Sequence, residues 1–313
     1  MNIGITGIGV YIPERMQQAE ELVNLVSTAD KKRSEVKMLK RMHHLHQTPI
    51  VDEDQPLEET IRLAVADLKQ HVTLDQVDLI LYSHALLTQV PYQHDLLYKV
   101  LQPFGLENIR RYGVAQLNCA SPFASMQLIQ DYMDQTEARQ VLLLCGDQTN
   151  LYPKARYVMR SLLIGDAATA VLFSKSAETN RLLACSTHFD DRFSEGIYED
   201  DQQVRFFNEQ YQTNIFSGIQ KTLAKANRKL DDVDYILPHN VNRTTWRTFC
   251  QQYDFPLERV VMDLIPQLGH TYTTDSQLVL HDCMEKQRLN KGDTYLMIAV
   301  GLGCFVGSAL FEY

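Results

Sequence analysis

The sequence predicts an α/β fold made of two similar halves. Short continuous apolar runs at residues 77–82 and 141–145 have the pattern of strands buried on both faces. Amphipathic helical patterns separate such runs, and this alternation is typical of layered α/β proteins with a mostly parallel sheet. The same strand patterns recur about 155 residues later in the chain.

The first elements follow this alternation. Residues 1–9 show no basic segment ahead of an apolar stretch and no small-residue cleavage site, so we interpret them as a first strand rather than a secretory signal. Pro56 opens a predicted helix with Glu58 and Glu59 in its first turn. The apolar residues of this helix have the spacing of one helix face: Leu57, Ile61, Ala64, Val65 and Leu68.

Two pairs of strand patterns share one offset. Residues 76–84 resemble residues 232–239, and residues 141–146 resemble residues 297–301. Because both offsets are close to half of the 313 residues, we infer a duplication. It predicts an N-terminal half at residues 1–170 and a C-terminal half at residues 171–313.

The composition excludes several classes of protein. Thirty Lys and Arg against 39 Asp and Glu give a net charge of −9, so the chain offers no global basic field to a nucleic acid. No apolar run approaches the roughly 18 residues of a membrane span, and we expect no membrane partner. Six widely spaced cysteines without a CxxC pair argue against a zinc knuckle or a disulfide framework. We expect a soluble protein in a reducing cytoplasm.

Two predicted helix starts carry reactive side chains. Cys119 precedes a helical pattern that begins near Phe123, and His270 precedes another that begins near Ser276. Since the two starts are separated by roughly the offset of the strands, a pseudo-twofold axis would bring Cys119 close to His270. The free N–H groups and the dipole of a helix start favour a thiolate, so Cys119 is the predicted nucleophile.

Other candidate sites are interpreted as structural. The remaining cysteines are expected to be small buried hydrophobes: Cys145, Cys185, Cys250, Cys283 and Cys304. His43, His44 and His46 do not predict a metal site, because adjacent histidines of a helix cannot converge on one ion. Gly7 and Gly9 lack the third glycine of a dinucleotide fingerprint. We expect neither a metal nor a bound cofactor.

Six motifs in chain order carry a resemblance to a known family. They are GITGIGVYIP at residues 4–13, NCAS at 118–121, LIGDAATAVL at 163–172, HNVNR at 239–243, GHT at 269–271 and VGLGCFVGSAL at 300–310. With them the sequence resembles the thiolase superfamily and, within it, the β-ketoacyl-acyl carrier protein synthase III family. The resemblance covers nearly the whole chain.

The resemblance implies a five-layer α-β-α-β-α fold, usually a homodimer, whose cysteine takes an acyl group from an acyl carrier protein or coenzyme A thioester. In condensing members a histidine and an asparagine then hold a malonyl thioester while CO₂ leaves. His239 matches the histidine, Asn242 matches a further family asparagine expected to bind substrate, and the catalytic asparagine falls on His270. The first prediction is therefore condensation of acyl-Cys119 with a malonyl-type thioester.

The histidine at position 270 leaves other functions open. Asp275 follows His270 by five residues, and a Cys-His-Asp set suits acyl transfer to a hydroxyl or an amine. A non-catalytic partner subunit that binds an acyl chain is a third alternative. Leu302, between two glycines, is expected to form an oxyanion hole with its own N–H and that of Cys119.

The acyl donor also stays open. The family segment that holds the coenzyme A adenine is not recognisable in residues 30–41, and Trp246 is the only tryptophan. This basic stretch could meet an acidic carrier protein, although such stretches are more often solvated helices.

Overall fold

A computed structural model describes residues 2–91, 93–150, 152–194 and 201–313. Nine strands form one central sheet, in the order β11-β12-β13-β10-β1-β9-β6-β4-β5. The strands of the first half are β1 (Gly4–Tyr11), β4 (Val77–Ser83), β5 (Arg111–Val114), β6 (Gln140–Asp147) and β9 (Ala167–Ser174). Those of the second half are β10 (Arg181–Phe189), β11 (Tyr235–Leu237), β12 (Thr294–Gly301) and β13 (Phe305–Glu312).

The two halves of the sheet repeat one strand order. Outward from the β1–β10 contact, β1-β9-β6-β4 on one side corresponds to β10-β13-β12-β11 on the other. The two sequence echoes pair β4 with β11 and β6 with β12, which hold matching places in this order. The division into residues 1–170 and 171–313 remains a prediction, with residue 170 inside β9 and β10 beginning at Arg181.

The expectation of a mostly parallel sheet is wrong. Only β4 with β5, β4 with β6 and β11 with β12 pair in parallel among the described strands of the central sheet. The other neighbours are antiparallel, and β12 and β13 are joined by a turn at residues 302–304, which is too short for a parallel crossover. An apolar run predicts that a strand is buried on both faces, but it carries no information on strand direction.

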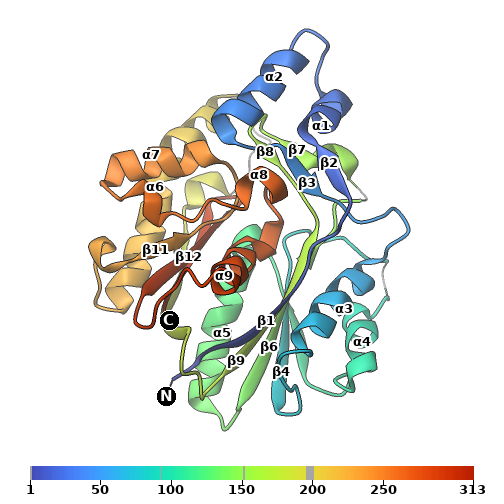
Figure 1. Cartoon of the computed structure of the whole chain (residues 1–313), viewed down its shortest axis with the longest axis vertical. Helices are drawn as coiled ribbons and strands as arrows, with labels where there is room; N and C mark the ends of the chain where they lie inside the picture. Colours follow the sequence, from blue (N-terminus) through green and yellow to red (C-terminus); the bar gives the residue numbers. More distant parts are fainter. Residues whose placement is uncertain (1, 92, 151, 195–200) are drawn as a thin grey trace.

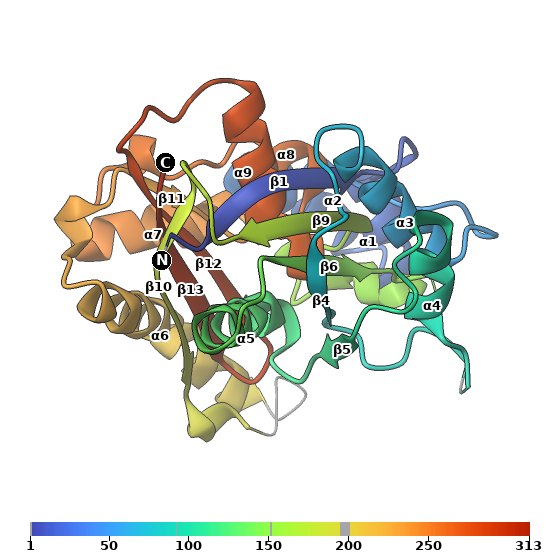
Figure 2. The same ribbon diagram turned by 90° about the horizontal axis from the view of Figure 1, so that it is seen from below.

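The two halves of the sheet and three sets of helices form five layers, as the resemblance implies (Figures 1 and 2). α5 and α9 lie in the middle, and their apolar side chains share one core with strands of both halves. α3 and α4 cover the outer face of the first half, and α6 and α7 cover that of the second. The helices of these layers are α3 (Leu57–Leu68), α4 (Leu96–Leu101), α5 (Ser121–Gln135), α6 (Asp201–Lys225), α7 (Arg243–Tyr253), α8 (Ile265–Leu268) and α9 (Asp275–Glu285).

The predicted helix after Pro56 is confirmed as α3. Its five apolar residues are all buried. Pro56 has an extended backbone, so the helix begins at the next residue, Leu57. β1 lies directly against this helix because Gly9 has no side chain. A Cβ at Gly9 would lie 2.3 Å from the Ala64 carbonyl oxygen.

A small group of N-terminal elements lies at one end of the molecule, beside β7 (Tyr157–Val158) and β8 (Leu162–Leu163) (Figure 1). It consists of β2 (Met16–Gln18), α1 (Ala19–Val26), α2 (Lys32–Met38) and β3 (Gln47–Pro49). No helix among the described residues is both long and apolar enough to cross a membrane. Short 3-10 and π turns complete the chain: η1 (Leu39–His43), η2 (Gln102–Phe104), η3 (Asn118–Ala120), η4 (Pro153–Arg156), η5 (Asp191–Phe193), η6 (Leu230–Asp232), η7 (Leu257–Arg259) and η8 (Tyr272–Thr274).

Candidate active site

Cys119 and His270 meet at the centre of the molecule. The Cys119 Sγ lies 3.0 Å from the His270 Nε2, although 151 residues separate them, and both side chains are buried. Cys119 lies two residues before α5, and His270 lies five residues before α9, the two central helices. The sequence-based expectation that the two helix starts face each other therefore matches the geometry of the site.

The turn before α5 holds the cysteine in place. η3 leads directly into α5, and Asn118 has the left-handed φ of 50° that bends the chain into it. The Asn118 side-chain amide donates to the Leu302 carbonyl at 3.0 Å, which ties this turn to the β12–β13 turn. Gly301 makes the approach possible, since a Cβ there would lie 2.1 Å from the Leu117 carbonyl oxygen.

The backbone of His270 is fixed on both sides. Its N–H donates to the Leu163 carbonyl at 2.8 Å, and its carbonyl accepts from the Gly165 N–H at 2.9 Å. Gly269, with a φ of 57°, provides the left-handed turn before it. The ring orientation thus depends on a segment of the first half, although His270 belongs to the second.

Asp275 completes a row of three side chains. Its Oδ2 lies 2.5 Å from the His270 Nδ1, and the Asn240 N–H donates to the same oxygen at 2.6 Å. Its Oδ1 accepts from the Thr271 N–H and the Thr271 hydroxyl, both at 2.7 Å. Four donors therefore hold this carboxylate in the geometry that orients the imidazole.

Charge favours the ionised forms of His270 and Asp275. Burial alone would lower the pKa of His270, but the negative charges of Cys119 and Asp275 outweigh it and raise that pKa well above its usual value. Burial alone would raise the pKa of Asp275, but the charge and hydrogen bonds of His270 and the Thr271 donors lower it. An imidazolium between a thiolate and a carboxylate is the arrangement that makes a cysteine nucleophilic.

Among the described residues, no histidine is hydrogen-bonded to the other cysteines, as expected of buried hydrophobes. Burial raises the pKa of Cys250 and Cys283 to about 11 and that of Cys304 to about 12. Burial also raises the pKa of Cys145 and Cys185. These thiols stay protonated at neutral pH.

His239 lies beside the row but is not part of it. Its ring centroid is 6.2 Å from that of His270, and its side chain is 0 % exposed. Burial, with a smaller contribution from the positive charge of His270, lowers its pKa to about 3, so His239 is neutral. Its Nε2 lies 3.0 Å from the Tyr211 hydroxyl.

The two predicted substrate-binding residues line the pocket above Cys119. Asn242 caps α7, accepting from the Thr245 N–H at 2.9 Å, while its amide donates to the Ser161 carbonyl at 3.3 Å. Leu302 is 40 % exposed at the β12–β13 turn. The roles of both in substrate binding remain proposals.

The pocket itself has a volume of about 230 Å³ and a largely apolar wall. Apolar side chains from both halves line it: Leu86, Val158, Met159, Leu162, Phe207 and Val300. A pocket of this character, with a few polar groups at one end, suits an acyl chain whose reactive carbon lies at Cys119.

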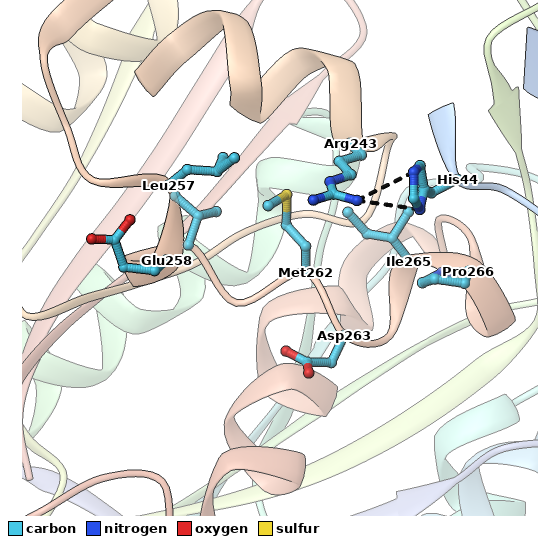
Figure 3. A pocket seen from close by; sticks show the side chains of 9 residues that line it. His44, Arg243, Leu257, Glu258, Met262, Asp263, Ile265 and Pro266 are labelled. Carbon is cyan, nitrogen blue, oxygen red and sulfur yellow. Dashed lines mark hydrogen bonds between the residues drawn. The ribbon is translucent and has the colours of Figure 1, made fainter. Parts of the chain in front are cut away.

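A larger depression of about 490 Å³ lies beside α7 and is shown in Figure 3. Arg243 and His44 line one end, where one Arg243 Nη1 lies 3.2 and 3.4 Å from the two ring nitrogens, and Glu258 lies at the other. Its lining contains neither Cys119 nor His270. His43 does not line this depression, and its Nδ1 lies 3.1 Å from the Thr244 hydroxyl.

Sequence reasoning missed several residues of the site. Asn240 and Thr271 lie in the quoted motifs HNVNR and GHT, but their contacts with Asp275 were not foreseen. Each uses a backbone N–H group, which every residue but proline carries, and Thr271 adds its hydroxyl. Tyr211 reaches His239 from α6, 28 residues earlier in the chain, and nothing in its own segment marks it. Asn118 belongs to the NCAS motif, but the motif does not predict that its side chain bonds to the Leu302 carbonyl.

Known proteins share this architecture. The family model for the 3-oxoacyl-[acyl-carrier-protein (ACP)] synthase III matches residues 115–191, and the model for its C-terminal part matches residues 223–313, together more than half of the chain. The β-ketoacyl-[acyl-carrier-protein] synthase III of Aquifex aeolicus is 21% identical over the full length of both chains. Synthase III 2 of Bacillus subtilis is 24% identical, with 99% of this chain and 98% of the relative covered.

Solved structures agree in fold. The Aquifex aeolicus synthase III has a TM-score of 0.84 at 19% identity, covering 99% of this chain and 100% of that one. The acyltransferase ChlB3 has a TM-score of 0.85 at 17% identity, covering 100% and 98%. Xanthomonas campestris OleA with bound lauric acid and lauroyl-CoA has a TM-score of 0.84 at 14% identity, covering 100% and 99%. The motifs, the duplicated five-layer fold and the two family models show that this chain belongs to the 3-oxoacyl-[acyl-carrier-protein] synthase III family.

Proposed function

We propose that this protein is an acyl-thioester transferase that forms acyl-Cys119 and condenses it with a malonyl-type thioester. One observation carries the first half-reaction: the Cys119 Sγ lies 3.0 Å from the His270 Nε2, and Asp275 holds the opposite nitrogen of that ring. Membership of the synthase III family supports the second half-reaction.

In the first half-reaction the Cys119 thiolate attacks the carbonyl carbon of the acyl thioester. The C–S bond of the donor breaks, and its thiolate leaves with the Nε2 proton of the His270 imidazolium. The N–H groups of Cys119 and Leu302 are proposed to hold the oxyanion of the tetrahedral intermediate. The product is acyl-Cys119 beside a neutral His270 whose Nδ1 proton is still bonded to Asp275.

In the second half-reaction the bond between the α-carbon and the carboxylate of the malonyl-type thioester breaks. CO₂ leaves, and the electron pair stays behind as an enolate. Its α-carbon attacks the acyl carbonyl, Cys119 leaves as a thiolate, and His270 regains a proton from solvent. Hydrogen-bond donors on the enolate oxygen lower this barrier, and His239 lies close enough to the row to take part.

A hydroxyl or amine acceptor is a second candidate, and the tie between His270 and Asp275 favours it. Because Asp275 accepts the Nδ1 proton, a neutral His270 presents a lone pair at Nε2. Such a nitrogen can remove a proton from an acceptor, as the base of a nucleophilic triad does. The acyl-Cys119 intermediate is common to both candidates. A non-catalytic acyl-binding subunit has no physical need for a cysteine beside this histidine and carboxylate.

The proposed donors are acyl carrier protein or acyl-CoA thioesters. The proposed state is a homodimer, supported by the edge strand β5 and by the exposure of Tyr112 (54 %) and Leu87 (59 %). All six cysteines are free thiols, which supports the proposal that the protein works in a reducing cytoplasm.

Intact-mass spectrometry tests the first half-reaction. We expect the protein to gain the mass of an acyl group from a panel of acyl-CoA and acyl-carrier thioesters. Cys119→Ala should gain none, and Cys250→Ala, which lies outside the row, should gain it normally. An equal increment on the Cys119→Ala protein would contradict the proposal.

Labelled CO₂ tests the second half-reaction. The acyl-enzyme should release ¹⁴CO₂ from a carboxyl-labelled malonyl thioester, and the Cys119→Ala protein should not release it at the same rate. Normal acylation without any ¹⁴CO₂ would reject condensation in favour of the hydroxyl or amine acceptor.

A further inference from the structure

His239 has one polar side-chain contact among the described residues. Its Nε2 lies 3.0 Å from the Tyr211 hydroxyl, and its Nδ1 has no hydrogen-bond partner in the described part of the chain. The ring is 0 % exposed and stands edge-on to Trp246, with centroids 5.4 Å apart. The His239 Nε2 can therefore bond to a substrate only if it leaves the Tyr211 hydroxyl. Otherwise His239 acts on the substrate indirectly, through Tyr211.

The neutral ring carries its proton at Nε2. If Nδ1 carried it, a buried N–H would point at no acceptor, and orphaned buried N–H groups are rare. The Nε2–H tautomer leaves only a lone pair without a partner, which is the less costly arrangement. His239 thus donates to the Tyr211 oxygen, and the Tyr211 O–H stays available to donate elsewhere.

Tyr211 presents that hydroxyl to the reaction pocket. It lines the pocket together with Cys119, His270 and Asn242. Burial raises its pKa above the ordinary value, so Tyr211 remains a neutral donor. A tyrosine hydroxyl can accept one hydrogen bond and donate another, and a bond accepted from His239 strengthens the one it donates.

The second half-reaction needs a donor that His270 does not supply. After acylation the remaining N–H of His270 is held by Asp275, and its Nε2 is a lone pair. A lone pair cannot stabilise a developing enolate oxygen. Tyr211 lines the same pocket, and its hydroxyl proton is free to serve as this donor.

We propose that Tyr211 is a further catalytic residue, whose hydroxyl donates a hydrogen bond to the carbonyl oxygen of the malonyl-type thioester as CO₂ leaves. His239 is a positioning residue that donates from Nε2 to Tyr211 and aims its hydroxyl. The inference rests on the proposed condensation and names the group that carries its second half.

Tyr211→Phe separates the two half-reactions. The variant keeps the ring and loses only the hydroxyl, so acyl-Cys119 should form at the wild-type rate, measured by intact mass. Release of ¹⁴CO₂ from the malonyl thioester should fall about 10²-fold, the usual cost of one oxyanion donor. The matched control is Tyr253→Phe, whose hydroxyl bonds only to exposed Gln252 among the described residues, and it should leave both rates unchanged. Equal ¹⁴CO₂ release by Tyr211→Phe and wild type would overturn the inference and leave the proposed function standing.

A spectroscopic test needs no substrate. In protein labelled with ¹⁵N-histidine, we expect His239 to be neutral from pH 5 to 8 with its proton on Nε2, and we expect the Nε2 resonance to shift in Tyr211→Phe but not in Tyr253→Phe. A proton on Nδ1 would mean that Tyr211 donates to His239, and it would overturn the inference even if condensation occurs. Absence of acyl-Cys119 in the wild type would instead reject the proposed function.

Discussion

A buried carboxylate, Asp275, influences the reactivity of Cys119 through the histidine that lies between them. Asp275 does not contact Cys119 directly; it acts on the charge of His270, which lies between them. The imidazolium exists only below the pKa of His270, and the charges of Cys119 and Asp275 both raise that pKa. The protonated ring is therefore present below this raised pKa and is lost as the pH rises through it.

Asp275→Asn should move the upper limb of the pH–acylation profile to lower pH. The substitution removes one of the two negative charges, so His270 loses its proton earlier, and acylation at pH 8 should fall about 10²-fold. The measurement is the rate of acyl-Cys119 formation from pH 5 to 9. Asp282→Asn, on the same helix and paired with Lys286, should leave the profile unchanged. A profile of Asp275→Asn that coincides with wild type would show that the carboxylate does not act on His270.

The same variant also tests the acceptor. If acyl-Cys119 passes to a hydroxyl or an amine, discharge should fall about 10³- to 10⁴-fold, because the base loses its orienting carboxylate. If it condenses with a malonyl-type thioester, discharge of preformed acyl-enzyme should change far less. Rapid-quench measurement of acyl-Cys119 loss distinguishes the two.

His239→Ala should leave the first half-reaction intact and slow the second about 10²-fold. Since His239 is neutral, with a pKa near 3, no part of the activity profile between pH 5 and 9 should report its titration. Accumulation of acyl-enzyme with slow turnover is the expected signature. Wild-type turnover in this variant would remove His239 from the mechanism.

The sequence located the residues that share a helix start or a motif. Cys119, His270 and Asp275 could be named because a helix start and a five-residue spacing are visible along the chain. Tyr211 could not, because its partner lies 28 residues away, and the two meet only through the packing of α6 on the strands of the second half. Side chains that act across elements leave no periodic signal.

At the scale of the elements, the β12–β13 turn holds the turn that carries Cys119. The Asn118 side chain donates to the Leu302 carbonyl, and Gly301, which has no side chain, lets the two turns pack closely. The sequence predicts strands and helices on either side of this turn, and the predicted helix α3 is confirmed. The prediction of a mostly parallel sheet is wrong, because strand direction depends on the length of the connections and on which strands pair. Contacts between turns likewise depend on the final arrangement of strands.

Gly301→Ala should damage activity more than stability alone explains. Its Cβ would lie 2.1 Å from the Leu117 carbonyl oxygen, which pushes the β12–β13 turn away from Cys119. Gly9→Ala is a matched control, because its Cβ would meet the Ala64 carbonyl oxygen of α3 at 2.3 Å, and α3 contributes no residue to the row. Both should lower the free energy of unfolding by about 1–3 kcal/mol, measured by denaturant titration. At a temperature where both are folded, only Gly301→Ala should lose acylation, and equal losses would contradict this role of the turn.

At the scale of the whole molecule, β5 leaves one end of the sheet open. The Arg110 and Val114 carbonyls accept from β4, so the N–H of Gly113 faces the outer edge. An open edge strand is a template for pairing with a second copy.

Gly113→Pro should convert the proposed dimer to a monomer. Proline removes the outward N–H and blocks strand pairing across the edge, whereas Gly113→Ala keeps the N–H and has room, since its Cβ would meet only the His84 ring at 4.0 Å. Light scattering should give twice 36.0 kDa for wild type and Gly113→Ala, and 36.0 kDa for Gly113→Pro. A wild-type monomer, or a dimeric Gly113→Pro protein, would place the interface elsewhere.

The separation of Cys119 from His270 by 151 residues has a consequence during synthesis. At about 5–20 residues per second, Cys119 is synthesised roughly 8–30 s before His270. Throughout this interval the nascent chain has no His270 to give a proton to the leaving thiolate of an acyl donor. The pair forms only when the second half docks on the first, so the order of synthesis keeps Cys119 without this partner until most of the second half has been made.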